Sequence, residues 1–214
     1  MKKTISIIIS IAMCAMLASC GGVKNGVSDT EQPTLMDTMS LEEKVGQILF
    51  VRCVEDEQTD DLMSIKPGGI LMFGRDFEGL TKDEVKEKIQ SYQDKSDIPL
   101  IIGADEEGGT VVRVSSNPNL APEKFKSPQE IYNEGGMDAV VENATEKSEL
   151  LLSLGVNMNL APVADVSTNP SDYMYDRSLG QNAEATADFV SKTVTAMNNA
   201  GIMSVLKHFP DMAV

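Results

Sequence analysis

Short apolar runs alternate with longer segments of helical periodicity from about residue 35 onwards. The runs have the length and composition of strands that are buried on both faces of a sheet; they are 70–73, 99–104, 156–162 and 202–206. Capping boxes and terminal glycines mark the helix ends between these runs; they are Ser40 with Glu43, Thr81 with Glu84, Gly155 and Gly201. Strands that alternate with helices form parallel β/α units, so the predicted fold class is α/β.

The helix signals also set the expected boundaries, which are one helix from Ser40, one from Thr81 to about Lys95, one over 137–154 and one over 183–200. Residues 47–53 either finish the first of these helices or form a first strand. The segment 115–126 is too irregular to predict as helix or strand.

Polar residues follow three of the predicted strands, namely Asp105, Asp165 and the pair Lys207–His208. Barrels of the (β/α)8 type carry their chemistry at this end of the strands. A nucleotide-binding sheet lacks local support, because the sequence contains neither Gly-x-Gly-x-x-Gly nor a Walker loop. A complete barrel has about 250 residues. We therefore expect a TIM-type (β/α)8 barrel of which this chain holds only the N-terminal portion, about five β/α units.

The N-terminal residues are typical of a bacterial lipoprotein signal. Lys2 and Lys3 precede an apolar stretch, and Leu17-Ala18-Ser19-Cys20 resembles a lipobox. We expect a signal peptide over 1–19, lipid on Cys20, and an anchor in the cell membrane that holds the protein outside the cytoplasm. The alternatives are an ordinary secretory signal and a short membrane anchor, each with an incidental cysteine.

Composition limits the partners and the organisation of the rest of the chain. Residues 20–34 are Gly-rich, polar and acidic, which predicts a flexible tether, and residues 35–214 are expected to form the partial barrel domain. The formal net charge is −15 without a Lys/Arg run, which argues against a nucleic-acid partner. Cys53 lies in an apolar run and is expected to be a buried thiol, and the lone histidine, His208, has no partners that would make a metal site.

The segment Gly103–Val114 (GADEEGGTVVRV) holds the most informative cluster of polar residues. An aspartate at a strand end, Asp105, accepts two sugar hydroxyls in one contact, and Arg113 adds a fixed fork of donors. Gly108-Gly109 allows a sharp turn and a close approach to a ligand. The alternative is an acidic surface turn with an Asp–Arg ion pair.

This segment resembles the D-x-E-G-G-x-V-x-R motif of family 3 glycoside hydrolases of the β-N-acetylglucosaminidase type. Three further segments resemble motifs of this family and follow in the family's order: NLAPVADV (159–166), DRSLG (176–180) and KHFP (207–210). Leu179 stands where the family usually has an aromatic residue. The resemblance runs from about residue 35 to residue 210.

The resemblance implies a substrate-binding set for the terminal N-acetylglucosamine of a glycan. In this family's pattern Asp105 grips sugar hydroxyls. Arg113 and Arg177 position this site or hold its rim. Lys207 and His208 bind further hydroxyls at the end of the fifth strand.

Three other residues have weaker support from the resemblance. Asp165 either supports the site or is satisfied by the local backbone, and the second role is at least as well supported. Tyr173 and Tyr175 are candidates for the entrance of the site, although exposed loop tyrosines are common.

The retaining mechanism of this family needs a carboxylate nucleophile and an acid/base. In the family the acid/base is a histidine on the loop after Lys-His-Phe-Pro, and the nucleophilic aspartate lies on a later strand. Here Asp211–Val214 follows Pro210 instead. No catalytic residue is therefore expected in this chain; both are expected beyond Val214, and the chain is expected to be an inactive fragment.

The implied function is that of a lipid-anchored exo-β-N-acetylglucosaminidase, which cleaves peptidoglycan fragments or other amino-sugar glycans through a covalent intermediate. The resemblance implies no metal and no organic cofactor. Two alternatives remain, a broader family 3 β-glucosidase and a sugar-binding lipoprotein without catalysis. A dinucleotide or phosphate domain is a third alternative that lacks its Gly-rich motif.

Overall fold

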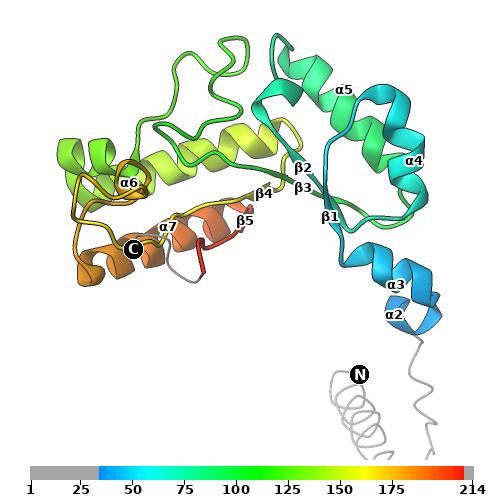
Figure 1. Cartoon of the computed structure of the whole chain (residues 1–214). Coiled ribbons are helices and arrows are strands. Elements are labelled where there is room, and N and C mark those ends of the chain that lie inside the picture. The colour runs from blue at the N-terminus through cyan, green and yellow to red at the C-terminus, as the bar shows by residue number, and fades with distance from the viewer. Residues whose placement is uncertain (1–33, 210–214) are drawn as a thin grey trace, which may run out of the picture. The chain divides into compact units, whose positions relative to one another are not determined.

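The computed structural model describes residues 34–209 (Figure 1). The predicted signal peptide, Cys20, the tether apart from Thr34, and Pro210–Val214 lie outside these residues, so the predictions for them stay predictions. Residues 34–38, with the short helix α2 (Leu35–Thr38), belong to one unit, and residues 39–209 belong to a second unit that is described from here on.

A parallel sheet of five strands organises residues 39–209 (Figure 1). The strands pair in chain order and are β1 (Phe50–Arg52), β2 (Gly69–Met72), β3 (Ile101–Ala104), β4 (Met158–Asn159) and β5 (Met203–Ser204). Sequential order is the order of a barrel, whereas a doubly wound sheet reverses its order at a switch point. The predicted α/β fold and partial barrel are therefore confirmed.

The helices cover one side of this sheet. They are α3 (Leu41–Gln47), α4 (Thr59–Ser64), α5 (Lys82–Gln93), α6 (Pro128–Ser153) and α7 (Ala183–Ala200), with short 3-10 turns η1 (Asp56–Gln58), η2 (Gly74–Asp76) and η3 (Tyr175–Arg177). The main apolar core lies between strands β2 and β3 and the helices, with Ile70 and Ile102 packed among Val85, Leu151 and Met197. Burial of these side chains is the main stabilising term of the unit.

The local helix signals agree well with the observed helix ends. Ser40 and Thr81 both form the predicted capping boxes, and Gly201 ends α7 in the left-handed region at φ 89°. The helix predicted from Met137 matches the second part of α6, because the non-helical pair Gly135-Gly136 divides α6 just before Met137. The first part of α6, from Pro128 to the glycine pair, was not predicted.

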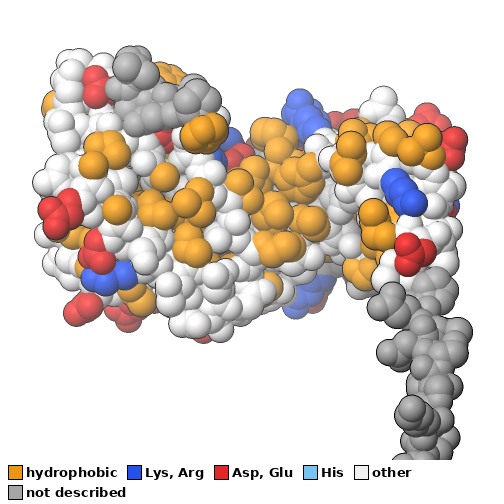
Figure 2. All heavy atoms as spheres, turned by 90° about the horizontal axis from the view of Figure 1, so that it is seen from below, with side chains coloured by type: hydrophobic (Ala, Val, Ile, Leu, Met, Phe, Trp, Pro, Cys, Tyr) orange, Lys and Arg blue, Asp and Glu red, His pale blue; other side chains and the backbone are white. Residues whose placement is uncertain are grey.

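Several strand predictions need correction. The pattern predicted strands over 156–162 and 202–206, but β4 and β5 have only two residues each, and the helix α4 was not predicted. The prediction that the strands are buried on both faces is wrong for the two edge strands, where Phe50 is 39% exposed and Met203 is 40% exposed. Figure 2 shows apolar side chains gathered over the sheet. Edge strands have a neighbour on one side only, so part of their apolar surface stays in solvent.

The Phe50 ring lies against two glycines of the neighbouring strands, Gly69 of β2 and Gly103 of β3. A Cβ atom at Gly103 would stand 2.6 Å from Phe50 Cζ, and one at Gly69 would stand 2.7 Å from Phe50 Cδ2. These positions allow the ring to lie close to the strands because glycine has no side chain.

Substitution of Gly103 tests this packing. Gly103→Ala is expected to lower the free energy of unfolding by about 1–3 kcal/mol, since the new methyl group overlaps the Phe50 ring. In a Phe50→Ala background the same substitution should cost less, and urea unfolding followed by circular dichroism measures both. Gly69→Ala is the matched control. Its Cβ would also lie 2.5 Å from the backbone oxygen of Ile101, so its cost should remain when the Phe50 ring is removed. An equal cost of Gly103→Ala in both backgrounds would contradict the proposed packing.

Candidate functional site

The predicted polar residues meet at the carboxyl ends of the strands, which all lie on the same side of the sheet. Asp105 follows β3 directly, Asp165 lies beyond β4, and Lys207 and His208 lie beyond β5, where Lys207 pairs with Val163 as an isolated parallel bridge. Parallel strands in sequential order place all their carboxyl ends on this side. The structure therefore brings together residues that are more than one hundred positions apart, as in the pair Lys207 and Asp105 (separation 102).

Lys207 holds one oxygen of Asp105, and within residues 34–209 the other oxygen has a longer ion pair with Arg113 and accepts no hydrogen bond. Lys207 Nζ donates to Asp105 Oδ1 at 2.6 Å, and the side chains are only 15% and 12% exposed for Asp105 and Lys207. Arg113 Nη2 lies 3.9 Å from Oδ2, which is beyond hydrogen-bond distance. Oδ2 is thus placed to accept a hydroxyl group, and Lys207 is placed to donate to one.

Glu107 is a central member of the cluster that the sequence analysis did not assign. Its carboxylate accepts two hydrogen bonds from Arg177, from Nε at 2.9 Å and Nη2 at 2.7 Å, and lies 2.5 Å from Lys207 Nζ. This paired contact raises the pKa of the Arg177 guanidinium above its ordinary value. The only sequence signal for Glu107 was its place in the motif that begins at Asp105.

His208 is fixed by groups on both sides of its ring. Asp165 Oδ2 accepts from the His208 backbone N–H at 3.0 Å and lies 2.8 Å from Nδ1, while Arg177 Nη2 lies 3.3 Å from Nε2. A carboxylate only accepts hydrogen bonds and a guanidinium only donates them. The contacts fit the tautomer that donates from Nδ1 to Asp165 and accepts at Nε2 from Arg177. The fully buried Asp165 side chain supports the site from behind His208.

A buried carboxylate anchors the loop between Asp105 and Arg113. Glu106 is fully buried and accepts from the backbone N–H groups of Arg113 (2.8 Å), Val114 (2.7 Å) and Ser115 (3.2 Å). Asn159 of β4 exchanges two hydrogen bonds with the Glu106 backbone, at 3.0 and 3.1 Å. These contacts satisfy the polar groups of a tightly folded loop and tie its position to the sheet.

Arg113 lies at the rim of the cluster, over an aromatic ring. Its Cζ is 5.8 Å from the centre of the Phe73 ring, and Arg52 Cζ is 4.8 Å from the same centre. Its Nε is buried without a hydrogen-bond partner within residues 34–209. Neither Phe73 nor Arg52 was predicted as part of the site, because one apolar and one basic residue at strand ends carry no distinctive pattern.

The two tyrosines that were candidates for the entrance of the site are not bonded to the polar cluster through their hydroxyl groups within residues 34–209. Tyr173 is 77% exposed and Tyr175 is partly buried. Leu179, at the unusual position of its motif, is fully buried in a small core with Val140 and Phe189.

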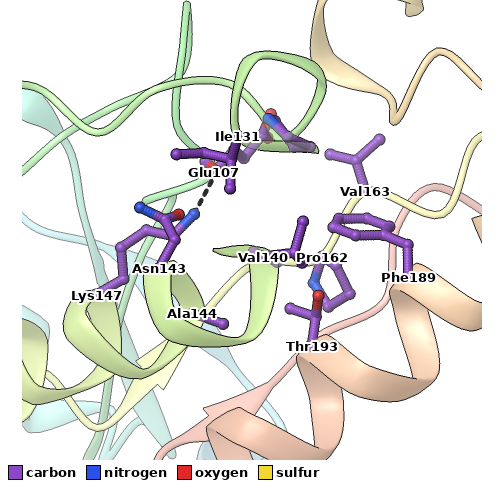
Figure 3. A pocket seen from close by; sticks show the side chains of 12 residues that line it. Glu107, Ile131, Val140, Asn143, Ala144, Lys147, Pro162, Val163, Phe189 and Thr193 are labelled. Carbon is purple, nitrogen blue, oxygen red and sulfur yellow. Dashed lines mark hydrogen bonds between the residues drawn. The ribbon is translucent and has the colours of Figure 1, made fainter. Parts of the chain in front are cut away.

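Lys147 of α6 reaches to the Glu107 backbone (Figure 3). Its Nζ donates to the backbone oxygen of Glu107 at 2.8 Å, and desolvation of the ammonium group lowers its pKa to about 8, against the opposing effect of Glu106 and Glu107. A cavity of about 20 Å³ adjoins it, lined by Val140, Phe189 and other apolar side chains. This space has room for about one water molecule and is too small for a sugar ring.

Three further observations concern metals, thiols and membranes. The residues from 34 to 209 contain no group of three or more His, Cys, Asp or Glu side chains that is arranged to hold a metal ion. Cys53 is fully buried beside the Tyr92 hydroxyl (3.1 Å), and burial raises its pKa, which confirms the predicted buried thiol. Among the helices of the described segment, none combines the length and the apolar character needed to span a bilayer.

The chain is similar to known proteins over most of its length. The sequence profile described as "Glycosyl hydrolase family 3 N terminal domain" matches residues 40–213. Beta-hexosaminidase A of Pseudoalteromonas piscicida is 31% identical over 147 residues, which cover 67% of this chain and 25% of that protein. Beta-hexosaminidase LpqI of Mycobacterium tuberculosis is 25% identical over 227 residues, which cover 97% of this chain and 57% of that protein.

A solved structure has a similar fold. The family 3 β-N-acetylglucosaminidase from Paenibacillus sp. str. FPU-7 superposes with a TM-score of 0.73 at 27% identity, over 82% of this chain and 34% of that chain. This chain thus spans between 25% and 57% of the length of the two curated relatives named above.

The pKa of Lys147 predicts a signed pH dependence of stability. Between about 8 and the ordinary value of 10.5, the unfolded chain binds more protons than the folded chain, so this lysine makes the free energy of unfolding rise with pH. Relative to Lys147→Met, the wild-type chain should gain up to about 3 kcal/mol across this range. Urea unfolding at several pH values measures the difference, with Lys124→Met at an exposed lysine as the control. A difference that stays flat or falls over this range would contradict the prediction.

Proposed function

The chain belongs to the glycosyl hydrolase family 3 N-terminal domain family, and we propose that its described residues form the sugar-binding part of a β-N-acetylhexosaminidase site. The activity proposed for such a site when it is complete is the removal of terminal β-linked N-acetylglucosamine by a retaining mechanism, and the described residues contribute the sugar binding. One observation carries the proposal: Asp105, Lys207 and His208 meet at the carboxyl edge of a partial barrel, with Arg177 beside them. The names of the relatives, which are β-hexosaminidases, support the choice of sugar.

The geometry suits a neutral, hydroxyl-rich ligand. Asp105 Oδ2 accepts a hydroxyl group, while the third N–H of Lys207 remains after its contacts with Asp105 and Glu107. Cations and carboxylates of the cluster neutralise one another, so no strong net charge faces the ligand. A sugar ring with adjacent hydroxyls fits this pattern of alternating acceptors and donors.

The described residues bind the sugar rather than cleave it. Retaining hydrolysis needs a carboxylate nucleophile and a separate proton donor. Within residues 34–209, Glu107 and Asp165 are committed to internal partners, and the His208 ring is held between Asp165 and Arg177. We therefore propose that this chain, as its sequence stands, binds N-acetylglucosamine and does not hydrolyse an aryl N-acetylglucosaminide.

The finer proposals rest on the sequence. Peptidoglycan fragments or other amino-sugar glycans are the proposed source of the sugar, and a lipid on Cys20 is proposed to hold the protein at the cell membrane, outside the cytoplasm. The lysines, the apolar stretch and the Leu17–Cys20 ending support this anchor. A β-glucosidase specificity remains the rival, and a preference for glucose over N-acetylglucosamine would favour it.

Sugar binding tests the proposed function directly. The full chain is expected to bind N-acetylglucosamine more tightly than glucose in an NMR titration, and Asp105→Ala should weaken this binding about 10- to 100-fold, since it removes a charged acceptor. Asp188→Asn alters an exposed ion pair with Lys192 on α7 and should leave the affinity unchanged. Absence of binding by the wild-type chain, or turnover of an aryl N-acetylglucosaminide, would overturn the proposal.

Lipidation is tested by cell fractionation. When the full chain is expressed in a bacterium, it is expected in the membrane fraction, and Cys20→Ser should move it to the soluble fraction because the lipidated thiol is gone. Cys14→Ser removes a cysteine from the predicted signal and is the matched control, which should stay with the membrane. Membrane retention of Cys20→Ser would contradict the anchor.

A further inference from the structure

We propose that Glu107 is a positioning residue of the sugar site, which holds Lys207 and Arg177 in the places from which they act. The inference rests on the proposed function and assigns a role to a residue that the family resemblance left without one. It follows from the burial of Glu107, from its partners, and from the way its own backbone is held.

Glu107 cannot itself contact a ligand. Its side chain is 1% exposed, and both of its carboxylate oxygens are occupied. Oε2 accepts from Arg177 Nε, and Oε1 accepts from Arg177 Nη2 and lies against Lys207 Nζ. Any effect of Glu107 on binding must therefore pass through these two cations.

The two cations come from separate loops, and both contact Glu107. Arg177 belongs to η3, beyond β4, and lies 70 positions from Glu107, whereas Lys207 follows β5. Lys207 is shared between Glu107 and Asp105, so Glu107 determines how Lys207 approaches the residue proposed to grip the sugar. The paired contact with Arg177 fixes the plane of the guanidinium.

Arg177 connects Glu107 to His208. Its Nη2 both donates to Glu107 Oε1 and lies 3.3 Å from His208 Nε2. A guanidinium that is locked on one side by a carboxylate has a fixed position on its other side. The position of the His208 ring thus depends on Glu107 through Arg177, and on Asp165 through Nδ1.

Glu107 is rigid enough to act as such a reference point. Its backbone N–H donates to the Val111 oxygen at 3.0 Å, and its backbone oxygen accepts from Lys147 Nζ at 2.8 Å (Figure 3). The chain turns at Gly108, where φ is 105° and a Cβ would stand 2.2 Å from the Lys126 oxygen. Only glycine fits this turn, so the peptide that carries Glu107 is fixed from both sides.

The single histidine of the chain allows this role to be tested without a ligand. In 15N-labelled full chain, the ring nitrogens of His208 give the only imidazole signals in a long-range 1H–15N spectrum. Glu107→Gln and Glu107→Asp should both shift the Nε2 signal, since the amide loses the paired contact and the shorter acid withdraws from Arg177. The Nδ1 signal should stay at its place, because Asp165 still accepts its proton.

A matched control separates this effect from a general change of charge. Glu134→Gln makes the same substitution at an exposed ion pair with Lys126 and should leave both His208 signals and the sugar affinity unchanged. Circular dichroism establishes that each variant is folded. Glu107→Asp keeps the negative charge beside Lys207 and Arg177, so it tests the proposal even where Glu107→Gln fails to fold.

The binding experiment completes the test. N-acetylglucosamine affinity is expected to fall about tenfold or more in Glu107→Asp, because misplaced donors lose most of their contribution to binding. Unchanged Nε2 signals and unchanged affinity in a folded Glu107→Asp would overturn the inference. If the wild-type chain binds no N-acetylglucosamine but the Nε2 shift is seen, the proposed function fails while the contacts made by Glu107 stand.

Discussion

Parallel pairing in chain order is the constraint on which the rest of this molecule depends. Each strand hydrogen-bonds to the next strand along the sequence, from β1 to β5, so every strand leaves the sheet at the same edge. A polar residue placed just after a strand therefore meets the polar residues that follow its neighbours. This explains how Asp105 and Lys207, from the third and fifth strands, come to lie 2.6 Å apart.

The groups that meet at this end of the sheet form a chain of contacts in which most neighbours have opposite charge. Acidic and basic side chains alternate in the order Asp105, Lys207, Glu107 and Arg177, and His208 lies between Arg177 and Asp165. A buried charge is costly unless it is paired, and here each one has at least one opposite partner or a hydrogen bond. Local neutrality is notable in a chain whose formal net charge is −15. It leaves a polar surface that suits sugar hydroxyls better than an ionic ligand.

The site is also continuous with the core behind it. Lys147 reaches from α6 to the Glu107 backbone, and Asn159 of β4 binds the backbone of Glu106. Helix, strand and loop thus hold the same short segment from different directions. Because these contacts are buried, a change in the packing of α6 acts on the polar cluster as well as on stability.

The sequence by itself determined the local features of this protein. The alternation of apolar runs and helices indicated the α/β partial barrel, capping boxes located the starts of α3 and α5, and the motifs named Asp105, Lys207 and His208 as neighbours. Such signals depend on residues a few positions apart, and these are what periodicity and capping record. Only the tertiary structure decided the lengths of β4 and β5, because ladder hydrogen bonds depend on the neighbouring strand. It also decided that Glu107 joins Arg177 to Lys207 and that Lys147 binds the Glu107 backbone, since contacts between residues 40 or 70 positions apart leave no trace in local pattern.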